Sequence, residues 1–208
     1  MQLHINNSAD KPSKTDSEHW VAMKSGEPAA LENLYRLYSA ALYNYGSKFS
    51  GDKDLVKDCI QELFVNLWTR REFISHPSDV RNYLFKSFRL SIFKKAALIN
   101  KNDEYLDTEN YPFSVTLSIE DELITGEQNN ALKSRLQNTI SSLTDRQREA
   151  VFLKFYENLS YEEIAEVMGI SVKATYKLMA RSLSFLRDNL SKDDLLLLIS
   201  LFYLKLYN

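Results

Sequence analysis

Apolar side chains recur at helical spacing through the first hundred residues of the chain. Steps of three and four residues place side chains on one face of an α-helix. The longest stripe with such steps contains Leu31, Tyr35, Tyr38, Leu42, Tyr45 and Phe49. A second stripe follows Gly51 and consists of Val56, Ile60, Leu63 and Leu67. After a loop that contains Pro77, a third set of apolar positions predicts a further helix from about Val80.

Beyond residue 100 this periodicity fades and then returns. Residues 101–131 are polar and acidic, with a few apolar residues near Phe113, and the stretch is long for a loop inside one compact domain. We therefore predict an all-α protein, with two small helical domains joined by an acidic linker. The predicted parts are a flexible arm at residues 1–18, a first helical domain at 19–100, the linker at 101–131, a second helical domain at 132–191 and an apolar C-terminal helix at 192–208.

The most specific local pattern runs from Leu159 to Arg181. Ser160 and Glu163 have the spacing of a capping box, which predicts that a helix begins just after Ser160. Gly169 can adopt the left-handed conformation that ends a helix in a tight turn. Ser171 can then cap a second helix. A short helix, a glycine turn and a second helix together predict a helix-turn-helix motif in the second domain.

The second helix of this motif has two distinct faces. At about 100° per residue, its apolar side chains from Val172 to Leu186 gather on one side and its basic ones on the other. No acidic residue occurs between Ser171 and Arg187. Such a helix can enter the major groove, although an ordinary helical hairpin with a basic surface is the alternative. The candidate DNA-contacting residues are Lys173, Ala174, Tyr176, Lys177, Ala180 and Arg181.

The net charge of −2 by itself argues against a nucleic-acid partner, but the charges are unevenly distributed. Residues 81–101 contain six basic and no acidic residues, whereas residues 102–130 contain eight acidic and no basic ones. Removing those eight from the 28 acidic residues leaves 20, against 26 basic ones. The distribution indicates two basic binding surfaces and an acidic connector, with an ordinary solvated linker as the alternative.

No catalytic constellation is visible in the sequence. The three histidines, His4, His19 and His76, are scattered without metal-ligand spacing, and neither common phosphate-binding glycine loop is present. The single cysteine, Cys59, lies in an apolar stripe and cannot form an internal disulfide, which fits a reducing cytoplasm. We therefore expect a cytoplasmic protein that is not an enzyme and that uses no cofactor, metal or small-molecule substrate.

The segment from Leu195 to Tyr207 is almost wholly apolar. Its thirteen residues would span about 20 Å as a helix, which is less than the roughly 30 Å hydrocarbon core of a bilayer. We predict a helix that packs back on the second domain rather than a transmembrane segment. A further hypothesis is that this helix also docks on an inhibitory partner protein.

Motifs of one known kind occur in both domains and in the same order. In the first domain they are residues 26–31 and 34–38, then Asp58 to Phe64 followed by Leu67 and Trp68, then Arg81 to Leu84. In the second domain they are Ser142 and Leu143, then Leu159 to Ala165, then Arg181. Over about residues 26–190 the chain thus resembles the extracytoplasmic-function group of the sigma-70 family. Two domains that match in order are more specific than one helix-turn-helix.

The resemblance implies a sigma factor, whose partners are core RNA polymerase, promoter DNA and in some cases an anti-sigma factor. The helix-turn-helix would read the minus-35 element. Polymerase contacts would come from Asp58, Gln61 and Glu62. The loop over residues 70–79 would hold a base flipped out of the minus-10 element, and the helix after it would meet the opened strand. The residues implied in these minus-10 contacts are Arg70, Arg71, Phe73, Arg81, Tyr83, Lys86 and Arg89.

Two other classes of protein fit parts of the same pattern. A one-component transcriptional regulator would use the helix-turn-helix to bind operators without polymerase, as a dimer on two half-sites. A helical interaction module at a membrane surface would use the aromatic helices and the apolar tail, and would ignore DNA. A requirement for core polymerase in specific DNA binding separates a sigma factor from both.

Overall fold

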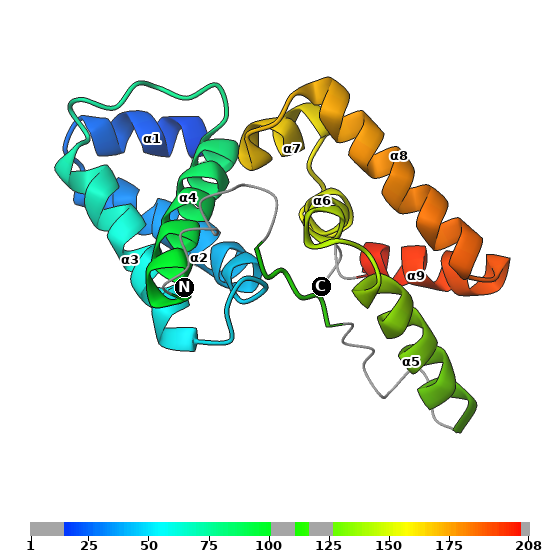
Figure 1. The fold of residues 1–208 in the computed structure, drawn as a ribbon. Helices are drawn as coiled ribbons and strands as arrows, with labels where there is room; N and C mark the ends of the chain where they lie inside the picture. The colour runs from blue at the N-terminus through cyan, green and yellow to red at the C-terminus, as the bar shows by residue number, and fades with distance from the viewer. Residues whose placement is uncertain (1–14, 101–110, 117–126, 205–208) are drawn as a thin grey trace, which may run out of the picture.

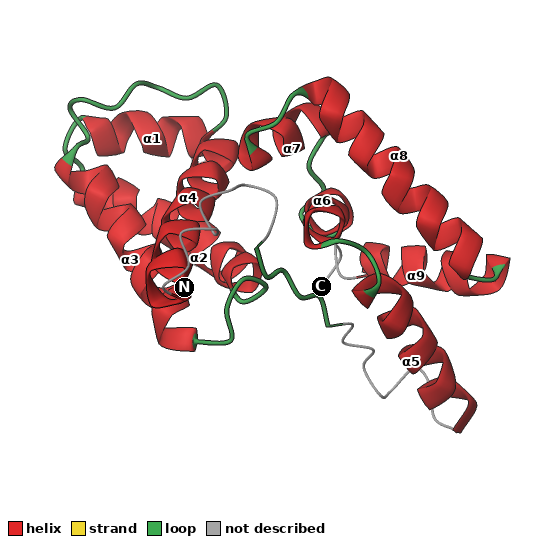
Figure 2. Cartoon of the chain, viewed as in Figure 1, coloured by secondary structure: helices red, strands yellow, loops and turns green. Residues whose placement is uncertain are grey.

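A computed structural model describes residues 15–100, 111–116 and 127–204 of the chain. All regular secondary structure in these ranges is α-helical, which confirms the predicted all-α class (Figure 2). The helices are α1 (Asp16–Lys24), α2 (Pro28–Gly46), α3 (Lys53–Thr69), α4 (Val80–Asn100), α5 (Glu127–Ser141), α6 (Asp145–Phe155), α7 (Tyr161–Met168), α8 (Val172–Asn189) and α9 (Lys192–Leu204).

Helices α1 to α4 form the N-terminal domain (Figure 1). The first of them starts where the sequence supplies a capping box, in which Thr15 and Glu18 satisfy each other's backbone amides. Gly46, the last residue of α2, lies where three helices meet. A β-carbon at this position would lie 2.6 Å from the Phe88 ring on α4 and 2.7 Å from Val56 on α3. The close approach of these helices therefore requires glycine.

The apolar stripe predicted along α2 is only partly buried. Tyr38, Leu42 and Tyr45 belong to the core, as expected. Tyr35 is instead 42% exposed, and Leu34 is fully buried in its place. The reason is that α2 packs against α1 and α4 as well as α3, so its buried face is not the one that a single partner would define.

Helices α5 to α9 form the C-terminal domain, to the right in Figure 1. Its first helix begins at Glu127, among residues that the sequence pattern assigned to the linker. Helix α9 contacts α5, α6 and α8, and its Leu198 is buried. An ion pair between Arg135 Nε and Asp194 Oδ2, at 2.9 Å, adds to this contact. The prediction that the C-terminal helix packs back on the second domain is confirmed.

Residues 111–116, within the predicted linker, are packed between the two domains. The backbone amide of Ser114 donates to the carbonyl of Lys48 in the N-terminal domain, at 2.8 Å. The amide of Phe113 donates to Asp145 Oδ1 in the C-terminal domain, at 2.9 Å. Phe113 is also buried. The few apolar residues of this acidic stretch thus form a segment that is attached to both domains.

Three predicted features lie wholly or partly outside the described residues. They are the N-terminal arm up to residue 14, the linker at residues 101–110 and 117–126, and the end of the apolar tail from residue 205. The arm predicted to reach residue 18 overlaps α1, which begins at Asp16.

Candidate nucleic-acid interface

The predicted helix-turn-helix is present as α7, a turn at Gly169 and α8. At its start, the Ser160 amide donates to Glu163 Oε2 at 2.5 Å, and the Glu163 amide donates to Ser160 Oγ at 3.2 Å. Burial opposes ionisation of Glu163, but hydrogen bonds from Ser160 and from the Asn82 side chain outweigh it and lower the carboxyl pKa. Gly169 has a φ of 67°, a left-handed conformation that glycine adopts without strain.

Helix α8 is held in place by its buried side. Met179 and Leu186 are buried there, together with the hydroxyl-bearing Thr175 and Ser182. Both hydroxyls donate to carbonyls of their own helix, at 3.3 Å for Thr175 and 2.8 Å for Ser182. Because these polar groups are satisfied within the helix, they add no cost to its burial. Val172, predicted on this buried side, is exposed at the first turn of the helix.

The other side of α8 carries the residues predicted to contact DNA. Ala174 is half-buried, and the remaining five are exposed, namely Lys173, Tyr176, Lys177, Ala180 and Arg181. The basic side chains among them therefore point to solvent while the opposite side of the helix is packed. This is the arrangement that allows a recognition helix to enter the major groove.

Tyr161, the first residue of α7, is a feature of this surface that the sequence pattern did not single out. Its ring meets that of Tyr176 on α8 edge-to-face, with centroids 4.5 Å apart and planes at 81°. Lys154 Nζ lies 5.3 Å from the Tyr161 centroid and also donates to the Leu159 carbonyl at 3.0 Å. These contacts fix Tyr176, half of whose surface is exposed, in one orientation on the recognition helix.

In the N-terminal domain, the loop between α3 and α4 borders a hollow of about 240 Å³. The hollow is lined by Leu63, Asn66, Leu67, Arg70, Ile74, Tyr83, Ser87 and Ser91. Two residues predicted for minus-10 contacts, Arg70 and Tyr83, thus meet at one place. Phe73 does not line the hollow and is 87% exposed at the loop surface. Arg71 lies over the Trp68 ring, 4.5 Å from its centroid.

The basic residues predicted on α4 all contact glutamates of the C-terminal domain. Arg81 Nη2 lies 2.8 Å from Glu157 Oε2. Lys86 Nζ lies 3.8 Å from Glu166 Oε1 on α7. Burial raises the pKa of the Glu157 carboxyl, although the Arg81 guanidinium acts against this rise.

The third basic residue, Arg89, is only 5% exposed and is bound to Glu149 of α6, which has no exposed surface. Arg89 Nε and Nη2 donate to the two carboxylate oxygens at 2.7 and 3.0 Å. The hydroxyls of Tyr45 and Tyr111 donate to the same carboxylate. Burial lowers the pKa of Arg89, but the Glu149 charge outweighs it, so that the pKa is raised and the guanidinium stays charged. We call these four residues the Glu149 cluster.

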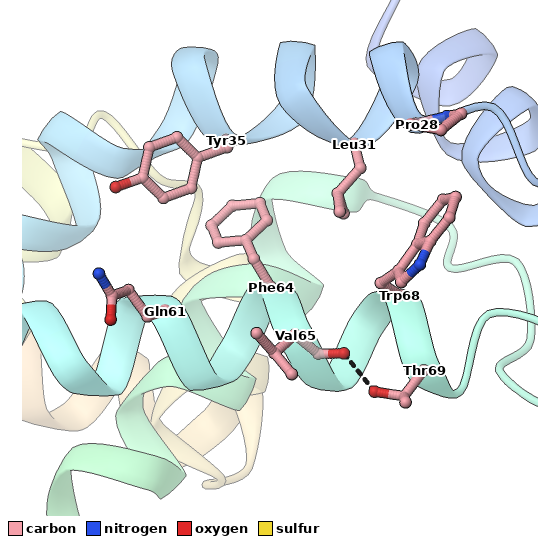
Figure 3. A pocket seen from close by; sticks show the side chains of 8 residues that line it. All are labelled: Pro28, Leu31, Tyr35, Gln61, Phe64, Val65, Trp68 and Thr69. Carbon is pink, nitrogen blue, oxygen red and sulfur yellow. Dashed lines mark hydrogen bonds between the residues drawn. The ribbon is translucent and has the colours of Figure 1, made fainter.

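An apolar groove of about 650 Å³ lies between α2 and α3, as Figure 3 shows. It is lined by Pro28, Leu31, Tyr35, Gln61, Phe64, Val65, Trp68 and Thr69. Gln61, one of the predicted polymerase contacts, lies in the groove. The other two, Asp58 and Glu62, are exposed on the same helix, and Glu62 accepts a hydrogen bond from Lys95 at 2.7 Å.

The family resemblance indicated the polar residues of this face, whereas the sequence pattern did not indicate that apolar side chains are exposed beside them. Val65 is the clearest example, because it lies off the apolar stripe of α3 and is strongly exposed. An apolar side chain off the buried stripe of an amphipathic helix is the signal that could have indicated the groove.

In the part of the chain that the structure describes, no group of three or more His, Cys, Asp or Glu side chains could hold a metal ion. None of the described helices combines the length and the apolar character needed to cross a bilayer. Cys59 is buried, as predicted, and burial raises the pKa of its thiol.

The exposure of α8 and the turn before it define the class of protein. A recognition helix with a packed rear and a basic front is how helix-turn-helix proteins read duplex DNA, and the chain falls within this class of DNA-binding proteins.

Comparison with known proteins indicates which kind of helix-turn-helix protein the chain resembles. The family model described as Sigma-70, region 4, matches residues 133–186, which contain the helix-turn-helix. The RNA polymerase sigma factor YlaC of Bacillus subtilis is 24% identical over 173 residues, which are 79% of this chain and 94% of that protein. SigM of the same species, an ECF RNA polymerase sigma factor, is 28% identical over 71% of this chain and 86% of its own. The ECF sigma factor BldN of Streptomyces coelicolor is 29% identical over 91% and 71%.

Solved structures share the fold at lower sequence identity. CnrH, in complex with the cytosolic domain of CnrY, has a TM-score of 0.55 at 20% identity and covers 82% of this chain and 94% of that chain. The sigma factor RpoE of Bartonella quintana, in complex with the anti-sigma factor NepR, has a TM-score of 0.55 at 17% identity, covering 78% and 97%. Over most of its length the chain is thus similar to sigma factors of the extracytoplasmic-function group, and its helix-turn-helix lies in the part matched by the sigma-70 family model. Members of this family are in general not enzymes.

Proposed function

We propose that this chain binds core RNA polymerase and directs it to promoters, where transcription then begins. The observation that carries the proposal is the basic, exposed face of α8, within the residues matched by the sigma-70 region 4 model. The role of this face is to bind DNA, and we assign no catalytic reaction to the chain. The three surfaces described above each take one task.

The face of α8 reads the minus-35 element. Lys177 and Arg181 lie one turn apart and are exposed, so they can reach guanine edges or phosphates in the major groove. Tyr176, fixed by Tyr161, offers an apolar ring to a thymine methyl group.

The loop between α3 and α4 takes up the melted minus-10 element. Extruding a base costs a few kcal/mol, which contacts in a pocket and stacking must offset. The hollow beside Arg70 and Tyr83 is the pocket that the described residues offer. Phe73, exposed on the same loop, supplies a ring on which a neighbouring base can stack.

The groove between α2 and α3 binds the polymerase. An apolar groove flanked by carboxylates fits a protein partner better than DNA. The carboxylates of Asp58 and Glu62 would repel phosphates, and a nucleic acid gains little from contact with apolar side chains. Helix α3 thereby connects the enzyme to the loop that holds the opened strand.

Reconstitution with core RNA polymerase tests this assignment. The full chain is added to the core enzyme on fragmented genomic DNA, and the 5′ ends of the RNA are sequenced. We expect a limited set of new start sites that share upstream sequence elements. Specific operator binding by the chain alone, as a dimer, with no new start sites, would instead identify a one-component regulator.

Substitutions then separate the tasks. Lys177→Ala with Arg181→Ala should reduce initiation at these sites at least tenfold while core binding is kept. The matched control is Arg187→Ala, since Arg187 is an exposed cation about 9 Å further along the same helix. Asp58→Lys should weaken core binding, whereas Asp188→Lys, an equal charge reversal on α8, should not.

We also propose an inhibitory protein as a partner, because two structures with the same fold were solved with such a protein or a cytosolic domain bound. Helix α9 is a candidate contact, because Leu196 is largely exposed while Leu198 is buried. Deleting the residues after Asp193 should then change inhibitor binding. Unchanged promoter activity, solubility and inhibitor binding would exclude a regulatory role for this helix.

A further inference from the structure

Helix α1 lies beside the loop that connects α3 to α4, as Figure 1 shows. The proposed function assigns no task to this helix, whose buried side chains pack on α2 and α4. Trp20 and Lys24 lie one turn apart on it. They contact Tyr83 and Ile74, two of the residues that line the hollow beside the loop. The helix therefore supports this hollow from behind.

Lys24 holds the backbone of the loop. Its ammonium group donates a hydrogen bond to the carbonyl of Ile74, 50 residues further along the chain. Lys24 is half-buried, so this bond is partly shielded from competing water. The Ile74 side chain lines the hollow, and its place there depends on the position of its own backbone. A cation on α1 thus fixes one part of the wall of the hollow.

Trp20 supports a second part of the wall. Its ring meets that of Tyr83 edge-to-face, with centroids 5.1 Å apart and planes at 72°. Trp20 has no exposed surface, whereas Tyr83 is half-buried and borders the hollow. A buried ring packed behind a partly exposed one limits the rotamers that the exposed ring can adopt.

A third contact joins the start of α1 to the loop beyond Ile74. The backbone turn that opens the loop ends where the Ile74 amide donates to the Arg70 carbonyl, at 3.1 Å. Two residues further on, His76 Nε2 lies 3.2 Å from Ser17 Oγ. The other ring nitrogen, Nδ1, lies 2.8 Å from the Pro77 carbonyl, which can only accept, so Nδ1 carries a proton. Beyond its opening turn, the loop is thus held by side chains of α1.

We propose that α1 positions the minus-10 loop, with Lys24 as its main positioning residue, and thereby sets how tightly the hollow binds an extruded base. The inference rests on the proposed function, because it takes the hollow as the base pocket. It adds that a helix behind the pocket contributes to discrimination at one base position. A pocket whose walls are already held in place binds more tightly, because less ordering is needed when the base enters.

Hydrogen exchange tests the positioning in the full chain without DNA. Lys24→Met removes the donor and keeps an unbranched side chain. We expect the amides of residues 72–79 to exchange at least threefold faster in this variant, with exchange in α3 and α4 unchanged. Lys53→Met is the matched control, since Lys53 is an exposed lysine about 24 Å away, at the other end of α3. Unchanged exchange in the loop, or faster exchange throughout the domain, would overturn the inference.

Removal of single bases tests whether the helix acts through the pocket. The holoenzyme is bound to a promoter fork from a start site found by reconstitution, with the minus-10 strand unpaired, and each base of the element is removed in turn. In the wild type we expect one position whose removal weakens binding most. Lys24→Met should weaken binding to the intact fork about three- to tenfold, but less than twofold when this base is absent. Lys24→Arg, which keeps a cationic donor, should bind nearly as well as the wild type.

Salt dependence separates positioning from a direct contact with DNA. If Lys24 contacted a phosphate, its removal would lower the slope of log affinity against log salt concentration by about one. We expect an unchanged slope for Lys24→Met, and a lowered slope would overturn the inference. An equal loss of binding on both forks would also overturn it, because Lys24 would then act on general stability.

The outcomes also separate this inference from the proposed function. A wild type whose binding depends on no single base would mean that the hollow is not a base pocket, so both assignments fail. A base-dependent position that Arg70→Ala impairs and Lys24→Met does not would keep the proposed function and refute the role of α1 alone.

Discussion

Helices α6 and α7 of the C-terminal domain both begin with a capping box, but the side chains that form the two boxes differ. Thr144 and Gln147 close a capping box at α6, and Ser160 and Glu163 close one at α7. Only the second box contains a group that titrates. Its acid lies where hydrogen bonds favour the ionised form, so a local signal in the sequence becomes a pH-dependent contribution to stability.

This contribution can be measured with Glu163→Gln, which keeps the shape of the box and removes its charge. The pKa of Glu163 in the folded chain lies below its ordinary value of 4.5, so ionised Glu163 stabilises the fold above that pH and the gain is lost as pH falls through the folded value. The difference in urea midpoint between the wild type and the variant should therefore shrink from pH 7 to pH 3. A constant difference would contradict this account.

A second prediction at this scale concerns Tyr161. If Tyr161 acts by orienting Tyr176, Tyr161→Leu should weaken minus-35 recognition by about 0.5–1.5 kcal/mol, the range for an aromatic pair. The same substitution in a Tyr176→Ala background should have almost no further effect. Promoter binding by the reconstituted holoenzyme, measured for the four members of this cycle, gives the coupling. Additive losses would assign Tyr161 a separate contact.

Residues whose role depends on near neighbours were predictable from the sequence, and residues whose role depends on distant ones were not. Ser160, Glu163 and Gly169 act within a few positions of each other, and the pattern identified all three. Arg89 and Glu149 are 60 positions apart, and no spacing rule connects them. Arg89 was therefore predicted as an exposed DNA contact, although the structure buries it.

At the scale of whole helices, periodicity predicted the positions of the helices more accurately than the faces that they bury. Helices α2, α3, α4, α7, α8 and α9 correspond to predicted ones. The buried face of α2 was partly wrong because three neighbours share it. The segment at residues 111–116 was missed as structure, because a short extended piece that is anchored by tertiary hydrogen bonds has no period of its own.

The meeting point of α2, α3 and α4 gives a prediction for this scale. Gly46→Ala should lower the free energy of unfolding by about 1–3 kcal/mol, because a β-carbon there must displace the Phe88 ring and Val56. Gly51→Ala is the matched control, since a β-carbon at that glycine meets no atom within 4 Å. Chemical denaturation of both variants measures the difference. Equal stability would show that the three helices separate without cost.

In the whole molecule, the Glu149 cluster contributes to stability and also joins the two domains. Arg89→Ala leaves a fully buried carboxylate without its cation and should destabilise the chain by about 3–5 kcal/mol. Replacing both partners, with Arg89→Met and Glu149→Leu, should recover most of that loss, since an apolar pair requires no charge compensation. Urea denaturation monitored by circular dichroism measures both. A double variant no more stable than the single one would mean that the tyrosine hydroxyls require the carboxylate.

The glutamates of the C-terminal domain and the α4 cations that they contact are parts of one polypeptide. Two groups joined in this way meet at an effective concentration on the order of millimolar, whatever the number of molecules present. Diluting the protein therefore leaves these contacts in place, whereas contacts between separate chains would be lost.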